Sequence, residues 1–346
     1  MKNARTIRSI AVLAALACAI GAMACGRAAV VTVYSADGLC DGRPNWFDTM
    51  FATFERRTGI TVQYVEAGSG VIVNRVLAER TAPQADVLVT IPPFMQVAAD
   101  AGVLRPLILA PADSSALGVP HAPALWYTLA EDYSAWIYDA AALPAPPASL
   151  TALLAPTFRN RLQYSTPGQA GDGTAVLLQA FEAFGSRSAG LAYLRRLQAN
   201  NLGPSASTGR LAALVDKGEI WVANGDVQMS YSQQRDYPNL RLFFPAGPDG
   251  RRLAMRLPYQ IALVRGAPHE QAALRLIAFL LSRPAQARLY DLARAFPARR
   301  DVPATTPAAR ALEQVIDGVR IWQPDWTRVA KELGHDVTLW RRATER

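Results

Sequence analysis

Residues 163–181 read QYSTPGQAGDGTAVLLQAF, a pattern that predicts a short strand, a glycine-rich loop and then a helix. The strand is expected to stop at Ser165 and Thr166, and an apolar helical pattern begins at Thr174. Hydroxyl groups and glycine amides therefore collect at a helix N-terminus, where N–H groups lack partners and the dipole is positive. Such a place suits a phosphate-like or carboxylate anion. A loop in which Asp172 or Thr174 only caps the helix explains the same pattern about equally well.

The part of the chain before this motif alternates between strands and helices. Strands are predicted over 30–34, 61–65 and 85–89, and helices over 46–57, 71–80 and 94–101. Such alternation is typical of a parallel sheet, which places ligands at the carboxyl ends of its strands. Two of these three strands end in a serine close to glycine, Ser35 and Ser69.

The chain is long enough for two domains, since about 320 residues remain after the N-terminal segment. Residues 125–139 alternate as strands do and are predicted to cross between lobes, and a strand over 259–264 marks the return. We predict a first lobe formed by 29–130 plus 258–346 and a second lobe formed by 131–257. The expected fold class is α/β, with a mostly parallel sheet flanked by helices in each lobe and the ligand in the cleft between them.

The N-terminus has the features of an export signal, which we place at 1–24. Its first eight residues carry three cations, and 10–24 is an apolar run too short to remain as a membrane span. Small residues before Cys25 offer a cleavage site. Lipid attachment at Cys25 is a weaker alternative, because Ala22 stands where leucine is usual. Either way, the mature protein is expected outside the cytoplasmic membrane, in the periplasm.

Charge and cysteine content exclude several classes of protein. The formal charge of +8 falls to +5 once the three N-terminal cations are removed, and basic runs interleaved with aromatic residues are missing, which argues against nucleic acid as a partner. Only Cys25 and Cys40 could remain in the mature chain, either bridged or with Cys40 free, so no thiolate metal site is expected.

Enzyme motifs are also missing from the sequence. The chain has no GxSxG, SxxK, HExxH or Walker A pattern, and its three histidines, His121, His269 and His335, are widely spaced. We therefore expect a binding protein with no cofactor and no metal. An exported enzyme that acts on phosphorylated compounds is the contrasting hypothesis.

Longer stretches resemble one family. Residues 266–286, which begin GAPH, are similar to the ferric-ion-binding branch of the periplasmic solute-binding proteins of ABC importers. Within that branch, the chain resembles the 2-aminoethylphosphonate-binding family through YSADGL (34–39), QYVEAGSG (63–70), PQADVLVTIPPF (83–94), STPGQAGDGTAVLLQAF (165–181), LQANNLGPSASTGRL (197–211) and VANGDVQMSYSQ (222–233). The likeness covers nearly all of the mature chain. It implies a type II-like fold of two lobes that close on the ligand, a monomer, and a membrane permease as partner.

One departure from the iron-binding members bears on the ligand. Those members bind ferric ion through adjacent tyrosines, whereas a predicted strand here reads MSYS over 229–232, with Tyr231 alone. Ferric ion is therefore a weaker alternative than 2-aminoethylphosphonate, as is another small phosphonate or phosphate ester.

The phosphonate group of such a ligand needs several N–H and O–H donors, each contributing about 1.5–3 kcal/mol. The residues predicted to supply them are Ser165, Thr166, Gly173 and Thr174 from the second lobe and Ser35 and Ser69 from the first. Ser207 and Thr208 are weaker candidates, because a simple hydroxyl-stabilised turn explains them as well.

The ammonium group needs an acceptor or an aromatic face. Asp37 is the predicted acceptor, with Tyr133 and Tyr231 as walls, although Asp37 is equally well explained as a turn residue. Other carboxylates that could serve are Glu131 and Asp132. Asp226 is interpreted as a turn residue before a strand.

Overall fold

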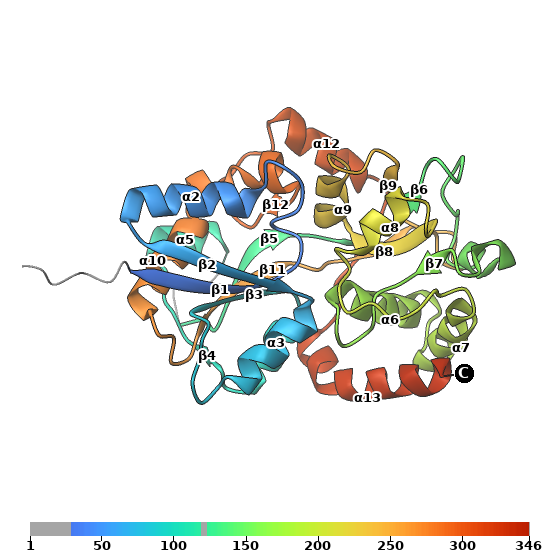
Figure 1. Cartoon of the computed structure of the whole chain (residues 1–346), viewed down its shortest axis with the longest axis horizontal. Coiled ribbons are helices and arrows are strands. Elements are labelled where there is room, and N and C mark those ends of the chain that lie inside the picture. Colours follow the sequence, from blue (N-terminus) through green and yellow to red (C-terminus); the bar gives the residue numbers. More distant parts are fainter. Residues whose placement is uncertain (1–28, 119–122, 346) are drawn as a thin grey trace, which may run out of the picture.

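The computed structural model describes residues 29–118 and 123–345. The described residues contain two main sheets that lie side by side, each flanked by helices, and a third sheet of two short strands, 253–255 and 320–322 (Figure 1). The predicted signal peptide and Cys25 lie outside the described residues, and Cys40 is a free, half-buried thiol. Within the described ranges, no helix is long and apolar enough to cross a membrane.

The larger sheet has seven strands and is formed by both ends of the chain. Its order is β12-β5-β11-β3-β1-β2, and β4 pairs with β11. The strands are β1 (Val30–Ala36), β2 (Thr61–Ala67), β3 (Val87–Thr90), β4 (Leu104–Arg105), β5 (Tyr127–Glu131), β11 (Tyr259–Val264) and β12 (Phe296–Pro297). Strands from before and after the second sheet are therefore neighbours in the larger sheet.

Both faces of this sheet are covered by helices because its central strands are apolar on both sides. Val31 and Val33 of β1 share a core with α2 (Trp46–Thr58) and α10 (Glu270–Leu280). Tyr34, on the opposite face, packs with α3 (Ser69–Ala78) and α4 (Phe94–Asp100). The alternation of side chains along β1 thus fixes which helix lies on which face.

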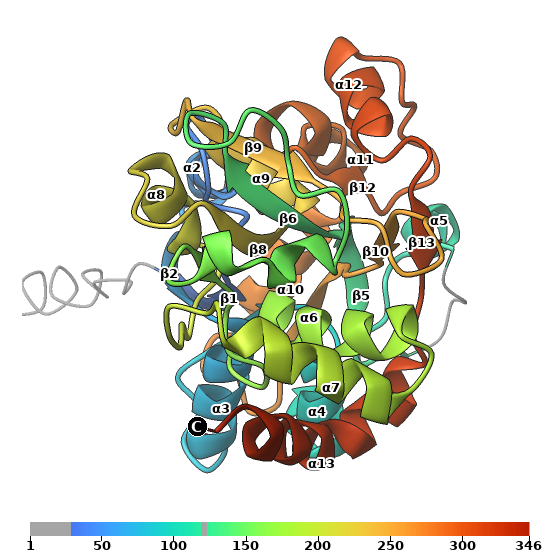
Figure 2. The ribbon, with the colours of Figure 1, turned by 90° about the vertical axis from the view of Figure 1, so that its right-hand side faces the viewer.

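The smaller sheet has the order β7-β8-β6-β9. Its strands are β6 (Ser134–Asp139), β7 (Leu162–Gln163), β8 (Val222–Asp226) and β9 (Leu240–Phe243). Around it lie α6 (Gly171–Ala183), α7 (Arg187–Gln198), α8 (Leu211–Asp216) and α9 (Val227–Gln233) (Figure 2). Its core is formed by large apolar side chains such as Trp136 of β6 and Leu177 of α6.

The prediction that each sheet is mostly parallel is wrong. In the larger sheet, β1 is parallel to β2 and β3, but β11 is antiparallel to β3, β4 and β5. In the smaller sheet, β7 and β8 are parallel, and β6 is antiparallel to β8 and β9. The reason is that the chain enters the smaller sheet along β6 and returns to the larger sheet along β11. Each of these two strands runs opposite to the parallel strands already in, or later added to, its sheet.

The rest of the chain packs around both sheets. It forms α5 (Pro111–Ala116), the short turns Ala152–Leu154 and Pro156–Phe158, β10 (Leu253–Met255), α11 (Arg283–Gln286), the π-helical turn Leu289–Ala293, α12 (Pro307–Val315), β13 (Arg320–Trp322) and α13 (Trp326–Thr344). Helix α13 contacts the cores on both sides: Leu333 packs beside α4, and Val337 and Trp340 pack on the core of the smaller sheet. The predicted lobe boundaries remain a prediction.

Two local predictions change. Residues 229–232, predicted as a strand, belong to helix α9, and Asp226 is the N-cap of that helix, where its Oδ1 accepts the Met229 N–H at 2.6 Å. An aspartate directly before a helix is a favourable N-cap, because its carboxylate accepts one of the free N–H groups of the first turn. The apolar residues that follow Asp226 suggest a strand instead. Helix α6 begins at Gly171, three residues before the predicted Thr174.

The fully buried carboxylate of Asp86 ties β1 to the segment that enters α10. It accepts the Thr32 N–H at 2.7 Å and the His269 N–H at 2.6 Å, and the His269 ring lies at 3.0 Å. We expect Asp86→Asn to lower the free energy of unfolding by about 1–3 kcal/mol, because the NH₂ group of the asparagine would replace an oxygen that accepts these N–H groups. Denaturant unfolding measures this, with the exposed Asp100→Asn as the control. Equal stability of the two variants would contradict it.

Candidate functional site

Helix α6 presents an uncapped N-terminus at the junction between the two sheets. The Thr174 N–H is bonded to the Ala170 carbonyl at 3.1 Å, so the amides of Gly171, Asp172 and Gly173 precede the first helical hydrogen bond. No side chain caps this helix. These amides and the helix dipole make a local positive field, as the sequence predicts.

Helix α3 brings a second N-terminus to the same place from the larger sheet. Its N-cap is Gly68, no side chain caps it, and its first residue is Ser69. The Gly70 N–H donates to the Gln169 carbonyl at 2.8 Å, which joins the two helix N-termini directly. A methyl group on Gly68 would lie 2.2 Å from the Ala206 carbonyl oxygen, so glycine is needed for this approach.

A narrow cavity of about 10 Å³, room for about one water molecule, lies where these segments meet. The residues that line it come from both sheets: Ala36, Asp37, Ser69, Ile91, Ala170, Gly171, Asp172, Thr208, Asp226, Met229 and Tyr259. None of them is Lys, Arg or His. The donors that face the cavity are therefore hydroxyl and backbone N–H groups.

The hydroxyl groups of Ser165 and Thr208 lie 2.8 Å apart and are both buried. Asn224 of β8 holds Ser165 in place: its Oδ1 accepts the Ser165 N–H at 2.8 Å, and its Nδ2 donates to the Ser165 hydroxyl at 3.0 Å. Thr208, a weaker candidate from sequence, lines the cavity, while Ser165 stands behind it.

The other residues predicted to bind the phosphonate are placed less directly. Ser69 lines the cavity, but the Ser35 hydroxyl donates to the Ala36 carbonyl at 2.8 Å and does not line it. The Thr166 hydroxyl accepts the Ser205 N–H, and the Thr174 hydroxyl accepts the Gly168 N–H at 3.0 Å. Thr166 and Thr174 therefore shape the loop, and Gly173 allows α6 to pack against the Ser165 carbonyl.

The three residues predicted to bind the ammonium group separate in the structure. Asp37 lines the cavity, and its Oδ2 accepts the Ser207 hydroxyl and the Gly209 N–H across the junction. Tyr133 packs against Phe296, and Tyr231 lies beneath the guanidinium of Arg294. Neither tyrosine lines the cavity, because each is turned toward the α12 side of the molecule.

Three buried carboxyl groups lie at or behind the cavity: Asp172, Asp226 and Asp132. Burial raises the pKa of Asp132 to about 8, with the charge of Asp172 adding to the effect. Burial also raises the pKa of Asp172 and that of Asp226 well above the usual range, and each is raised further by a neighbouring aspartate. Sequence reasoning left Asp172 as a possible cap and Asp226 as a turn residue, because local pattern cannot show that two distant loops meet.

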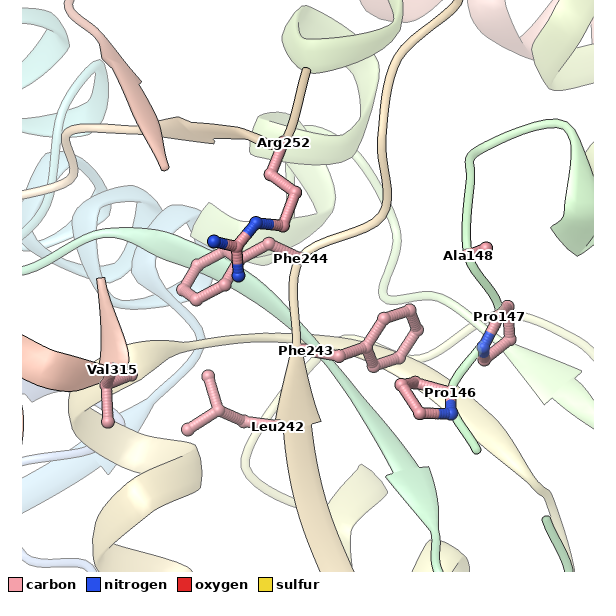
Figure 3. A pocket seen from close by; sticks show the side chains of 8 residues that line it. All are labelled: Pro146, Pro147, Ala148, Leu242, Phe243, Phe244, Arg252 and Val315. Atoms are coloured by element: carbon pink, nitrogen blue, oxygen red, sulfur yellow. The ribbon is translucent and has the colours of Figure 1, made fainter. Parts of the chain in front are cut away.

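The apolar hollow in Figure 3 is separate from this site. It is lined by Pro146, Pro147, Ala148, Leu242, Phe243, Phe244, Arg252 and Val315. Arg252 supplies its one charge, and none of these residues lines the cavity at the helix N-termini. Its apolar surface does not suit a small charged ligand.

Two α/β halves with a polar site between them define a two-lobed binding protein, and solved structures show the same fold. A periplasmic thiamin binding protein matches with a TM-score of 0.76 at 18% identity, covering 92% of this chain and 96% of that one. The periplasmic binding protein P5PA matches with a TM-score of 0.74 at 16% identity, covering 92% of this chain and all of that one. Apo ferric ion-binding protein A of Pasteurella haemolytica matches with a TM-score of 0.65 at 18% identity, covering 91% of this chain and 97% of that one.

The chain belongs to the bacterial extracellular solute-binding protein family, whose model matches residues 49–314. Relatives in Salmonella typhimurium and Salmonella paratyphi A are 50% identical over 316 residues, which is 91% of this chain and 93% of theirs. Each is named "Putative 2-aminoethylphosphonate-binding periplasmic protein". Family membership makes this chain an extracellular protein that binds a small solute.

We expect Gly68→Ala to weaken ligand binding by preventing full closure of the cleft. Alanine fits the local backbone (φ −54°, ψ 145°), so the clash with the Ala206 carbonyl arises only when the two halves meet. The matched control is Gly203→Ala, where an added methyl group meets no atom within 4 Å. Calorimetric titration and thermal melting measure both. Wild-type affinity in Gly68→Ala would contradict the prediction.

The buried aspartates also predict how the ligand-free protein responds to pH. Because folding raises the pKa of Asp132 from about 4 to about 8, its contribution to stability is complete below pH 4 and is lost as pH rises through 8. We expect the melting temperature to fall between pH 5 and 8.5, by about 1.5 °C for each kcal/mol lost in a chain of this length. Asp132→Asn should flatten this fall. A steeper fall in the variant would contradict the assignment.

Proposed function

We propose that this protein captures 2-aminoethylphosphonate outside the cytoplasmic membrane and delivers it to the permease of an ABC importer. Support comes from the site and from the relatives. The observation that carries the proposal is the meeting of two uncapped helix N-termini, of α3 and α6, at a cavity lined by hydroxyl groups. Since the cavity has room for only about one water molecule, the two halves would have to part to admit the ligand. The Salmonella relatives, at 50% identity, are named for this ligand.

The phosphonate oxygens would accept hydrogen bonds from both halves of the molecule. On one side are Ser69 and its own amide, because the Gly70 N–H is already bonded to Gln169, and on the other are Thr208 and the amides of Gly171 and Asp172. An anion held this way stabilises the closed arrangement, because neither half alone supplies all of the donors. The Asp37 carboxylate accepts the Gly209 N–H across the junction, and this hydrogen bond would stabilise the closed form without contacting the ligand.

The same reading makes the protein a carrier and not an enzyme. Membership of the solute-binding protein family supports this. Ferric ion is not favoured, because Tyr231 lies under Arg294 and does not line the cavity. We further propose that the mature protein is a periplasmic monomer released by cleavage after residue 24, without lipid at Cys25.

Calorimetric titration of the mature protein tests the proposal. We expect one-to-one binding of 2-aminoethylphosphonate, with ethylphosphonate and inorganic phosphate binding much more weakly. Ser69→Ala should weaken binding by about tenfold, the value of one charge-assisted hydrogen bond. The exposed Ser115→Ala is the matched control. Failure to bind 2-aminoethylphosphonate would overturn the proposal, and tight binding of phosphate alone would replace the ligand with a simple anion.

A further inference from the structure

The carboxyl groups around the cavity have no cationic partner. Asp37, Asp172 and Asp226 line it, and no Lys, Arg or His is among the described residues that do so. Two more acids stand close behind, Asp132 and Asp41, and their charges act on Asp226. Tyr259 completes the titratable groups that face this space, and its hydroxyl donates to the Asp37 carbonyl at 2.8 Å. A site built only for an anion would not gather so many acids.

Asp172 differs from the other acids in what its oxygen atoms contact. The residue is 6% exposed, and its Oδ1 is buried with no hydrogen-bond partner, while the rest of the carboxyl group is hydrogen-bonded to the Thr208 side chain. By contrast, Asp226 Oδ1 accepts the Met229 N–H at 2.6 Å and Asp132 Oδ1 accepts the Gln228 N–H at 2.9 Å. Buried carboxylate oxygens are normally satisfied, so an unpartnered one at a ligand cavity points to a missing donor.

The position of Asp172 in the fold specifies the donor. It is the second residue of α6, so its carboxyl group lies beside the amides assigned to the phosphonate. A ligand held there by an anionic group would bring its other end close to Asp172. A cation at that end would pair with the carboxylate and satisfy it, whereas an apolar end would leave it unpaired in a buried place.

We propose that Asp172, whose buried Oδ1 has no partner at the cavity, binds the ammonium group of the ligand. This inference rests on the proposed function, because it assumes an aminoalkylphosphonate. Burial favours the protonated forms of the neighbouring Asp132 and Asp226 in the empty site, which limits their repulsion. The ammonium group, which keeps its own three protons, stabilises the charged forms of these acids, so we expect a carboxyl proton to leave to solvent when the ligand binds.

The test compares two ligands of the same shape, 2-aminoethylphosphonate and n-propylphosphonate, in which a methyl group replaces the ammonium. Wild-type protein and Asp172→Asn are titrated in two buffers of different ionisation enthalpy, which gives affinity and the number of protons released. Comparing the two proteins with the same ligand cancels the titration of the phosphonate itself. Asp100→Asn, at the exposed end of α4, is the matched control.

We expect Asp172→Asn to bind 2-aminoethylphosphonate about 10- to 150-fold more weakly and to release fewer protons. Its affinity for n-propylphosphonate should stay the same or rise, which a damaged site would not show. Affinity of Asp172→Asn for 2-aminoethylphosphonate within about twofold of wild type would overturn the assignment and leave the proposed function standing. If wild-type protein binds neither ligand, the proposed function itself fails, and this inference fails with it.

Discussion

The close approach of two loops, 68–70 and 168–171, is the constraint on which the site depends. Each loop precedes a helix, and the Gly70 N–H bonds to the Gln169 carbonyl at 2.8 Å, so the two helix N-termini face one another across a few ångströms. A methyl group at Gly70 would collide with the Gly168 carbonyl of the opposite loop, and one at Gly68 would collide with the Ala206 carbonyl. These glycines therefore bring the positive ends of two helix dipoles together, and a negatively charged group nearby is needed to offset them.

That positive field is opposed by the buried acids, and the balance between them explains the ligand chemistry. A phosphonate alone would gain from the helix amides but would stand close to the carboxyl groups of Asp172 and Asp226. A zwitterion avoids this conflict, because its cationic end meets the acids while its anionic end meets the amides. The raised pKa values of Asp172 and Asp226 agree with this balance, because a bound proton neutralises a carboxylate in the empty site as the ammonium group would in the occupied one.

Sequence patterns predicted most of the fold and part of the site. The strands β1, β2 and β11 and helices α2 and α10 follow from apolar periodicity, which depends on neighbours in the chain. The direction of β11 does not, because it is set by how the chain returns from the other sheet. Ser69 and the N-terminus of α6 could be picked out as candidates because hydroxyl and glycine residues mark the ends of strands, and both lie at the cavity in the structure. The pairing of Asp132 with Asp226 was missed, since 94 positions separate them and each has an ordinary local explanation.

The closed arrangement is also held by contacts that need no ligand. Gln228 of α9 donates to the Gly38 carbonyl at 3.1 Å, Gly209 donates to Asp37, and Gly70 donates to Gln169, all across the junction. These bonds lower the free energy of closure, so a ligand has to supply only the remaining difference between open and closed forms. These contacts also limit how strongly closure can discriminate between ligands. The more of the free energy of closure comes from the protein's own contacts, the less comes from contacts with the ligand. The unpaired Asp172 oxygen keeps closure sensitive to the ligand, because closing on an empty or apolar site buries that carboxyl group without a partner.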